Sequence, residues 1–267
     1  MEKQYLNHPL NRIDLNSDIG ESFGNYTLGL DAEVIPFISS ANIACGYHAG
    51  DPTVMRETVS LAKANGVALG AHPGLPDLVG FGRRNMDVTM EEIKDVVTVQ
   101  IGALQAVAAL QGARLQHVKP HGALYNMAVK NPAIWDVVAE VMATLDPRLI
   151  LFVLSGSDRK ELEEIGRRRG IRVAFEFFAD RAYNPDGSLV SRKLPGAVIC
   201  DQETVEARVL KLVQEGRVTA VDGSSIDLKA DTICVHGDNP EAVALAKKIR
   251  ATLAAAAVAV VPPDSFL

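Results

Sequence analysis

The stretch Ile13-Asp14-Leu15-Asn16-Ser17-Asp18 decides how we expect the chain to fold, because apolar and polar residues alternate along it. Successive side chains of a β-strand point to opposite faces, so Asp14, Asn16 and Asp18 would share one face. In a closed barrel that polar row would enter the lumen near its mouth, where carboxylates crowd and a pKa can rise. Burying three polar groups without a use is costly, which favours a functional row. The alternative is that Asp14 lies at an edge and that Asp18 and Glu21 only shape the following turn.

Outward from this stretch, short β-rich segments alternate with longer segments of helical period. The clearest helical segment runs from residue 89 to 111, where Ile93, Val97, Ile101 and Leu104 recur on one stripe. Each strand together with the helical segment after it forms one β/α unit, and the pattern predicts seven units. The predicted strands span residues 12–16, 40–45, 67–71, 115–119, 149–154, 171–178 and 232–236.

The predicted helices carry capping signals at both ends. A side-chain acceptor followed by proline predicts an N-cap and the first helical residue, and a threonine three residues before glutamate predicts a capping box. Glycine after a helical run predicts a left-handed C-terminal end. These signals occur at Asp51-Pro52, Asn131-Pro132, Asn239-Pro240, Thr89 with Glu92, Gly112, Gly170 and Gly216.

Repeated β/α units leave two architectures, an open doubly wound sheet or a closed barrel. Polar clusters follow nearly every predicted strand, and only a barrel brings all such loops to one face. The clusters span residues 18–21, 46–51, 72–77, 120–125, 180–184 and 237–239. We therefore predict a seven-stranded β/α barrel that forms a single domain over residues 1–267. Residues 187–199 and 217–228 are expected to be excursions or hairpins outside the repeat.

Composition narrows the class of protein. The 267 residues include 27 Lys and Arg against 33 Asp and Glu, a formal net charge of −6, and 48% are hydrophobic, which excludes disordered and fibrous classes. No basic stripe indicates a nucleic-acid partner. Three widely spaced cysteines indicate neither a disulfide framework nor a zinc knuckle. Residues 1–12 lack a secretory apolar run, and the longest apolar run, 253–261, is too short to cross a bilayer. We expect a cytoplasmic protein without nucleic-acid or membrane partners.

Polar residues an even number of positions apart, and therefore on one strand face, recur at the ends of three later strands. These pairs are Lys119 and His121, Glu176 and Asp180, and His236 and Asp238. Four strands therefore deliver polar groups to one end of the predicted barrel. Lys119 would lose hydration if buried, so it is either a functional amine or one half of a structural salt bridge to an acidic lumen residue. His121 is followed by Gly122, which leaves backbone room for a ligand.

Histidines invite a search for metal ligands. His48 lies between glycines at a strand exit and His72 precedes Pro73, so each either contacts a ligand or packs a loop. His117 and His121 are four residues apart, but in a strand this spacing spans roughly 13 Å and they cannot chelate one ion. A site assembled across strands from Asp14, His48, His72 and His236 remains open.

Basic residues in the loops could bind a substrate carboxylate. Gly80-Phe81-Gly82-Arg83-Arg84 is a glycine-rich loop with two cations and suits an anion clamp, unless it is only a solvated loop. Arg181 follows Asp180 directly and could pair with it. No phosphate-binding Gly-x4-Gly-Lys-Ser/Thr, no Gly-x-Gly-x-x-Gly after the first strand and no Gly-x-Ser-x-Gly occurs. Nucleotide use would therefore need another cradle or another chain.

The chain contains several long ordered motifs, at residues 14–24, 42–51, 70–74, 80–84, 118–125 and 176–181. They resemble one known family, the LamB/YcsF lactam-utilisation family, which forms the A subunit of bacterial ATP-dependent 5-oxoprolinase. The resemblance runs from the first strand to His236-Gly237-Asp238. It implies a barrel like those of the glycoside hydrolase/deacetylase superfamily, and it implies partner subunits B and C. It also implies that 5-oxo-L-proline, ATP and water give L-glutamate, ADP and phosphate.

For that reaction we form a hypothesis about the roles of single residues. The general base would be Asp14 or His121, and Lys119 with His236 would stabilise the developing charge. Arg83 or Arg181 would bind the substrate carboxylate. The other predicted substrate-binding residues are Asn16 and His48, which would orient the lactam, and Asp18, His72, Glu176 and Asp180.

Two other functions stay open. The chain could be a metal-dependent hydrolase that acts alone on an amide or an N-acyl sugar, or a non-catalytic subunit that carries the lactam. The deacetylase relatives hold metal through a His-x3-His on a helix-like turn, which this sequence lacks, so the sequence leaves the metal content open.

Overall fold

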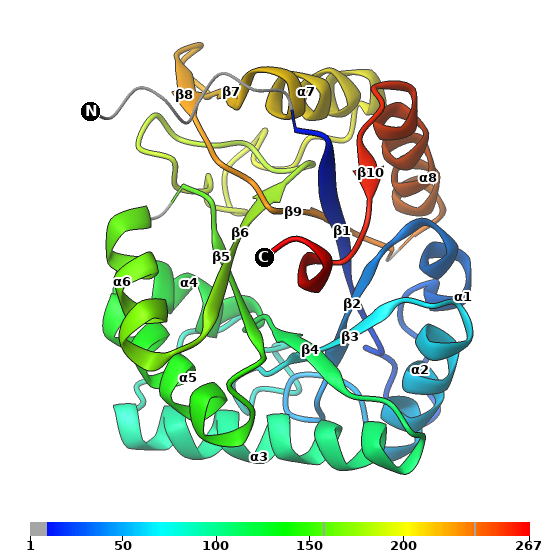
Figure 1. Ribbon diagram of the computed structural model, residues 1–267, viewed down its shortest axis with the longest axis vertical. Coiled ribbons are helices and arrows are strands. Elements are labelled where there is room, and N and C mark those ends of the chain that lie inside the picture. Colours follow the sequence, from blue (N-terminus) through cyan, green and yellow to red (C-terminus); the bar gives the residue numbers. More distant parts are fainter. Residues whose placement is uncertain (1–9, 157, 238) are drawn as a thin grey trace.

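Seven parallel strands close into a barrel in the computed structural model, which describes residues 10–156, 158–237 and 239–267 (Figure 1). Each strand pairs with the next, and the last pairs with the first through Asp14 and Thr232, so the open doubly wound sheet is excluded. The predicted β/α barrel is confirmed. Its strands are β1 (Arg12–Ile19), β2 (Ser40–Ala44), β3 (Ala68–His72), β4 (Leu115–Val118), β5 (Ile150–Leu154), β6 (Arg172–Phe178) and β9 (Thr232–Val235).

Helices surround the barrel and carry the predicted caps (Figure 1). The Asp51 carboxylate accepts hydrogen bonds from the amides of Thr53 and Val54, and Thr89 and Glu92 form a reciprocal capping box. Asn131 both ends α4 (Gly122–Lys130) and caps α5 (Pro132–Leu145), so the unit after β4 contains two helices. The helices are α1 (Asp31–Val34), α2 (Pro52–Ala64), α3 (Met90–Leu110), α4 (Gly122–Lys130), α5 (Pro132–Leu145), α6 (Arg159–Arg169), α7 (Gln202–Glu215) and α8 (Pro240–Ala255), with 3-10 turns at Ile35–Phe37 and Pro263–Ser265.

Helix α3 is the one helix in the described part of the chain that is long and apolar enough to cross a membrane. Its stripe of Ile93, Val97, Ile101 and Leu104 is buried, and the helix packs on β3, β4, α2 and α5. A single buried stripe is typical of a helix that packs one face against a protein core.

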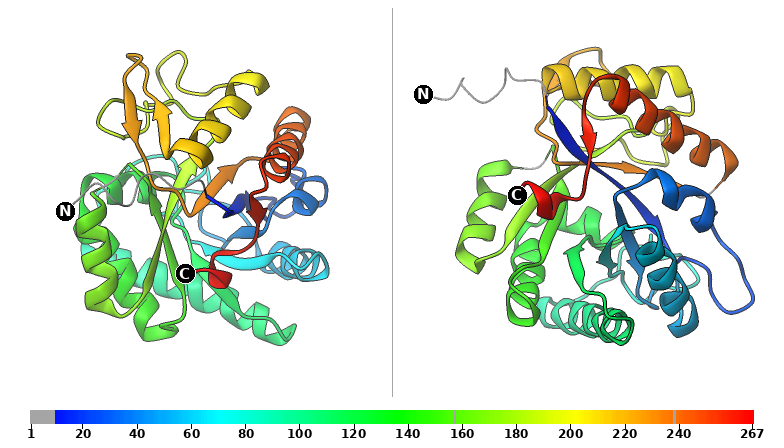
Figure 2. Two further views of the ribbon diagram at one scale, coloured as in Figure 1. Left: turned by 45° about the horizontal axis from the view of Figure 1, so that its top comes forward. Right: turned by 45° about the vertical axis from the view of Figure 1, so that its right-hand side comes forward.

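Additional segments flank the barrel. Strands β7 (Arg217–Thr219) and β8 (Ser225–Asp227) form an antiparallel hairpin beside α7, as predicted for residues 217–228 (Figure 2). The two-residue strand β10 (Ala259–Val260) pairs with the start of β1 and was not predicted, because it is too short to show a period. The expectations for residues 1–9 and for Asp238 lie outside the described residues, and the single domain over residues 1–267 stays a prediction.

The C-terminal turn lies at the end of the barrel where the strands begin. Asp264 accepts hydrogen bonds from Arg114, just before β4, and from Arg172, the first residue of β6. The Arg12 guanidinium lies over the ring of Phe266, 5.3 Å from its centroid. These contacts cover the amino ends of the strands, so the loops at the carboxyl ends form the other face.

The lumen becomes more polar from its floor to its mouth. At the floor, Ile150, Phe152 and Ala174 form an apolar cluster, and the His117 ring stacks on Phe152 with centroids 4.2 Å apart. Above it, a chain of hydrogen bonds joins side chains of four strands. His117 donates to Asn42, Asn42 donates to Asn16 and Asp18, Asn16 donates to Thr232, and Thr232 donates to Asp14. The predicted polar face of β1 is therefore confirmed.

Gly70 provides a test of this interior packing. A methyl group at Gly70 would overlap the imidazole of His117, which cannot move because it stacks on Phe152 and bonds to Asn42. We expect Gly70→Ala to lower the free energy of unfolding by about 2 kcal/mol or more in chemical denaturation. Gly102 in α3 has open space around it, so Gly102→Ala should leave stability unchanged or raise it by up to about 1 kcal/mol. Equal changes in the free energy of unfolding for Gly70→Ala and Gly102→Ala would contradict the packing of His117 against Gly70.

Candidate active site

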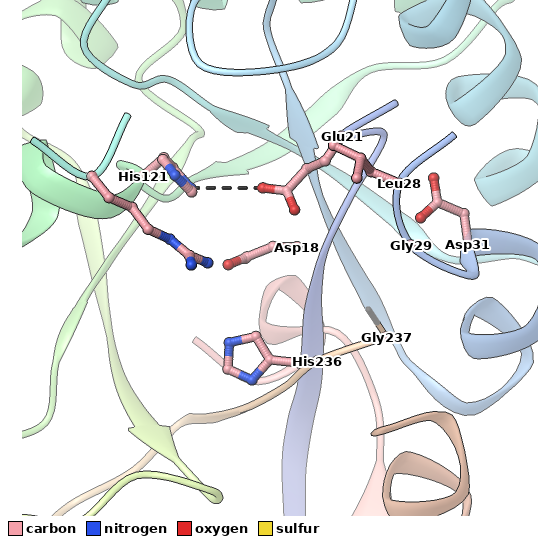
Figure 3. Close-up of a pocket in the computed structure, with 9 residues that line it drawn as sticks. Asp18, Glu21, Leu28, Gly29, Asp31, His121, His236 and Gly237 are labelled. Atoms are coloured by element: carbon pink, nitrogen blue, oxygen red, sulfur yellow. Dashed lines mark ion pairs between the residues drawn. The ribbon is translucent and has the colours of Figure 1, made fainter. Parts of the chain in front are cut away.

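A pocket opens where the strands end, as expected for a β/α barrel. It encloses about 400 Å³, its open mouth included, and Figure 3 shows carboxylates and imidazoles facing one another across it. The lining residues come from the end of β1 and from the segments after β1, β3, β4 and β9. They are Asp18, Glu21, Leu28, Gly29, Asp31, Arg83, His121, His236 and Gly237.

Lys119 lies just beneath the pocket, with only 2% of its side chain exposed. Its ammonium group is 2.9 Å from Asp18 Oδ1 and 2.8 Å from Glu176 Oε1. Burial opposes the charge on Lys119, but Asp18, Cys234 and Glu176 raise its pKa well above the usual value. Burial likewise opposes the charge on Asp18, yet His72 and Lys119 hold the pKa of Asp18 well below its usual range. Lys119 therefore forms the salt bridge to acidic lumen residues that was one of the two alternatives for it, and a role as a functional amine stays a prediction.

Three histidines cluster beside Asp18. The rings of His48 and His121 stack with centroids 3.7 Å apart, and His72 meets His121 edge-on. Burial and neighbouring histidines lower the pKa values of His48 and His121 well below the usual value, so both imidazoles are neutral near pH 7. Glu21 Oε1 lies 3.4 Å from His48 Nε2. It also lies 3.7 Å from His121 Nδ1, the ion pair that is dashed in Figure 3.

Backbone carbonyls fix the protonated nitrogen of two of these rings. His72 Nδ1 lies 2.6 Å from the Lys119 carbonyl, and His121 Nε2 lies 2.9 Å from the Phe81 carbonyl. Because a carbonyl oxygen only accepts, each of these nitrogens carries a proton. The remaining nitrogens, His72 Nε2 and His121 Nδ1, face each other at 2.9 Å.

Three further groups at the pocket have displaced pKa values. Burial and then Asp18 raise the pKa of Glu21, and burial raises the pKa of Asp31 to about 6 although Gly20 donates its amide proton to the Asp31 carboxylate. His236 Nδ1 lies 2.7 Å from Asp180 Oδ2. Burial opposes a charge on His236, but the Asp180 carboxylate raises its pKa above the usual value.

Most predicted site residues therefore meet at this end. Asp18, Arg83, His121 and His236 line the pocket. Immediately behind them, in contact with a lining residue or with Lys119, lie Asn16, His48, His72, Lys119, Glu176 and Asp180.

Two assignments do not fit the structure. Asp14 is fully buried four residues before Asp18 on β1, sealed by Ser39, Ser40 and Thr232, so it cannot act as the base on a ligand in the pocket. Arg181 donates to the carbonyls of Ala197 and Val190, because it anchors the 187–199 excursion. It binds no pocket ligand in this position, and Asp180 pairs with His236 instead.

Only one of the two cations of the predicted anion clamp lies at the pocket, and anion binding stays a prediction. Arg84 pairs with Asp77 within the loop, whereas Arg83 lines the pocket. The proposed metal set of Asp14, His48, His72 and His236 is also not brought together. His48 and His72 instead meet Glu21 and His121.

Sequence reasoning missed two pocket carboxylates. Glu21 was interpreted only as a turn residue, although its place three residues after Asp18 at a strand exit was a usable signal. Asp31 begins the short helix α1 and reaches the pocket by accepting a hydrogen bond from the Gly20 amide, which no local pattern indicates.

Comparison with known proteins places the chain among related sequences. A model of the LamB/YcsF family matches residues 13–267. The A subunit of 5-oxoprolinase from Thermococcus onnurineus is 56% identical over 256 residues, which cover 96% of this chain and 99% of the relative. That of Bacillus licheniformis is 53% identical over 251 residues, 94% of this chain and 98% of the relative. The crystal structure of a lactam utilization protein from Thermus thermophilus superposes with a TM-score of 0.87 at 46% identity, covering 94% of this chain and 99% of the other.

The corrected position of Asp14 predicts a pH dependence of stability. Burial raises the pKa of Asp14 from 3.8 to about 6, so the folded chain keeps a proton that the unfolded chain releases. The free energy of unfolding should therefore fall as pH rises from about 4 to about 6. Asp14→Asn cannot titrate, so its stability relative to wild type should rise over this range by up to roughly 3 kcal/mol. Urea denaturation of both proteins at several pH values measures the difference, and a flat difference would contradict the assignment.

Proposed function

The chain belongs to the LamB/YcsF family, and we propose that it is the A subunit of an ATP-dependent 5-oxoprolinase. The observation that carries the proposal is the 53–56% identity, over nearly the whole chain, to relatives that bear this subunit's name. These relatives support a role in lactam utilisation. The finer proposal is that this chain, with partner subunits B and C, opens 5-oxo-L-proline to L-glutamate while ATP is hydrolysed. Its free cysteines suit a reducing cytoplasm.

A five-membered lactam is resonance-stabilised, so its carbonyl must be activated before water can open the ring. Phosphorylation of the amide oxygen by ATP would create an electrophilic carbon and release ADP. Water would then add to that carbon, and the ring nitrogen would leave with a proton to give an acyl phosphate. A second water would release phosphate and glutamate. Because this sequence has no Gly-x4-Gly-Lys-Ser/Thr, we assign ATP binding to the partner subunits.

Cations at the mouth of the pocket suit an anionic substrate. Arg83 is exposed at the rim and is free to form a bidentate pair with the substrate carboxylate. The Asp180 carboxylate raises the pKa of His236, and the protonated ring would stabilise negative charge that develops on the phosphorylated lactam. Lys119 does not line the pocket, so we now assign it to positioning Asp18.

We assign the general base to Asp31. One of its oxygens accepts the Gly20 amide proton at 2.8 Å, and its pKa of about 6 suits proton transfer near neutral pH. His121 is less suited, because Nε2 donates to the Phe81 carbonyl and Nδ1 faces His72 at 2.9 Å.

Reconstitution tests the proposal and its alternatives. Glutamate release from 5-oxo-L-proline and ATP should be absent with this chain alone and appear when subunits B and C are added. Asp31→Asn in the full complex should lower kcat about 100-fold or more without abolishing lactam binding. Wild-type turnover by Asp31→Asn would contradict the base. Turnover by the chain alone would favour a self-sufficient hydrolase, and full turnover by B and C without it would reduce this chain to a carrier.

Arg83→Gln tests how the substrate carboxylate is bound. Loss of one charge-assisted pair should raise the KM for 5-oxo-L-proline in the complex roughly 10- to 100-fold and change kcat little. Arg56→Gln removes an exposed arginine of α2 that pairs only with Glu57 among the described ion pairs, so it should match wild type. The assignment fails if KM is the same in Arg83→Gln and Arg56→Gln.

A further inference from the structure

The four nitrogens of His72 and His121 pose a proton-counting problem. Their outer nitrogens donate to the carbonyls of Lys119 and Phe81, and their inner nitrogens face each other at 2.9 Å. If both rings are neutral, the two inner nitrogens both present lone pairs, which repel at this distance. A cation is therefore required at the junction, and it is either a third proton or a metal ion.

The surroundings of the junction favour a metal ion over a proton. Glu21 Oε1 and both ring nitrogens of His48 are buried and have no hydrogen-bond partner in the described part of the chain. One proton between His72 and His121 would leave these atoms unsatisfied. Within that same part of the chain, the ion pairs of Glu21 are with histidines alone. Neighbouring Asp18 has Lys119 as well as His72, whose Nε2 lies 3.4 Å from Asp18 Oδ2. A divalent cation would compensate Glu21 and take both lone pairs.

The distances also suit coordination. Metal bonds of about 2.0–2.2 Å place neighbouring ligand atoms roughly 2.9–3.5 Å apart. The inner nitrogens of His72 and His121 are 2.9 Å apart, and Glu21 Oε1 is 3.7 Å from His121 Nδ1. All the candidate ligand atoms lie within 4.8 Å of one another, so small side-chain movements close the site. Metal-binding imidazoles typically donate their second N–H to a carbonyl or carboxylate, and both of these do.

We propose that His72 Nε2, His121 Nδ1 and Glu21 Oε1 bind a divalent first-row transition-metal ion, such as Zn²⁺. Two imidazoles and one carboxylate are a ligand set that such ions use when they keep positions open for other ligands. Glu21 and His121 line the pocket, so the open positions face it. This site goes beyond the proposed function and does not depend on it.

His48 would be a positioning residue in this site. Its ring stacks on His121 with an angle of 3° between the planes, so its in-plane lone pairs run parallel to those of His121 and cannot converge with them on one ion. Its Nε2 lies 3.4 Å from Glu21 Oε1 without forming a hydrogen bond in this position, and it would donate a proton to that carboxylate after a small shift of Glu21 onto the ion. His48 would thus orient the carboxylate ligand.

The second group of candidate ligands does not form an equivalent site. Asp18, Cys234 and His236 also lie close together, but the Lys119 ammonium already donates to Asp18 Oδ1 at 2.9 Å and to Cys234 Sγ at 3.3 Å. A lysine cation in this position occupies the place of a metal ion. Cys234→Ser is therefore a matched control in the same lumen.

Metal analysis of the full chain tests the proposal without measuring turnover. Wild-type protein dialysed against Zn²⁺ should retain about one equivalent, and Cys234→Ser should retain the same amount. Glu21→Gln and His72→Gln should each weaken binding by about 100-fold or more, beyond the loss typical of an outer-shell change. Bound Co²⁺ should give visible absorption bands in wild type that are lost in Glu21→Gln.

Wild type alone also provides a test, in case a variant fails to fold. Zn²⁺ at about a hundredfold excess over its Kd should raise the Tm of chelator-treated wild type by roughly 5 °C or more. No retained metal and no shift of Tm would overturn the proposal and leave a shared proton at the junction. Loss of metal in Cys234→Ser with full binding by Glu21→Gln would overturn it in favour of the other group.

Discussion

The ion trio of Lys119 with Asp18 and Glu176 is the interaction on which the active end of the barrel depends. Asp18 belongs to β1, Glu176 belongs to β6, and Lys119 directly follows β4. The Lys119 ammonium group holds the two carboxylates together across the lumen. Removing one partner of such a buried group leaves an uncompensated charge, which typically costs about 3–5 kcal/mol. The trio therefore fixes how far along the barrel axis Asp18 lies, and with it the position of the side chains that surround Asp18 at the pocket.

The histidine cluster is built on this base. His72 donates to the carbonyl of Lys119, so the backbone that carries the ammonium also orients the ring. His121 is held from the opposite side by the carbonyl of Phe81, in the glycine-rich loop after β3. This loop, which was predicted to bind an anion through its arginines, thus contributes a backbone hydrogen-bond acceptor. The same loop brings Arg83 to the rim of the pocket. The glycine-rich loop therefore positions both Arg83, which would bind the substrate carboxylate, and His121, a ligand of the metal site that we propose.

Much of this arrangement was predictable. The alternation along β1 correctly predicted a polar row in the lumen, and the caps at Asp51, Asn131 and Asn239 correctly marked helix starts. The predictions failed where a residue's depth in the lumen mattered. Asp14 and Asp18 share one face, but only Asp18 reaches the mouth, because β1 continues past its predicted end to pair with β2 through residue 19. The alternation of side chains along a strand determines which face of the strand a residue lies on, but not how deep in the barrel lumen it lies.

The sequence by itself determined the repeat of strand and helix, the inward face of each strand and the family, because these depend on local periodicity and on ordered motifs. Only the tertiary structure decided which polar groups meet. Glu21 follows β1, His48 follows β2, His72 ends β3 and His121 follows β4. They converge because the closed barrel brings the carboxyl ends of its strands to one face. Arg181, beside Asp180 in sequence, is turned away by the excursion it anchors. Such convergence depends on strand register and closure, which no local stretch of sequence records.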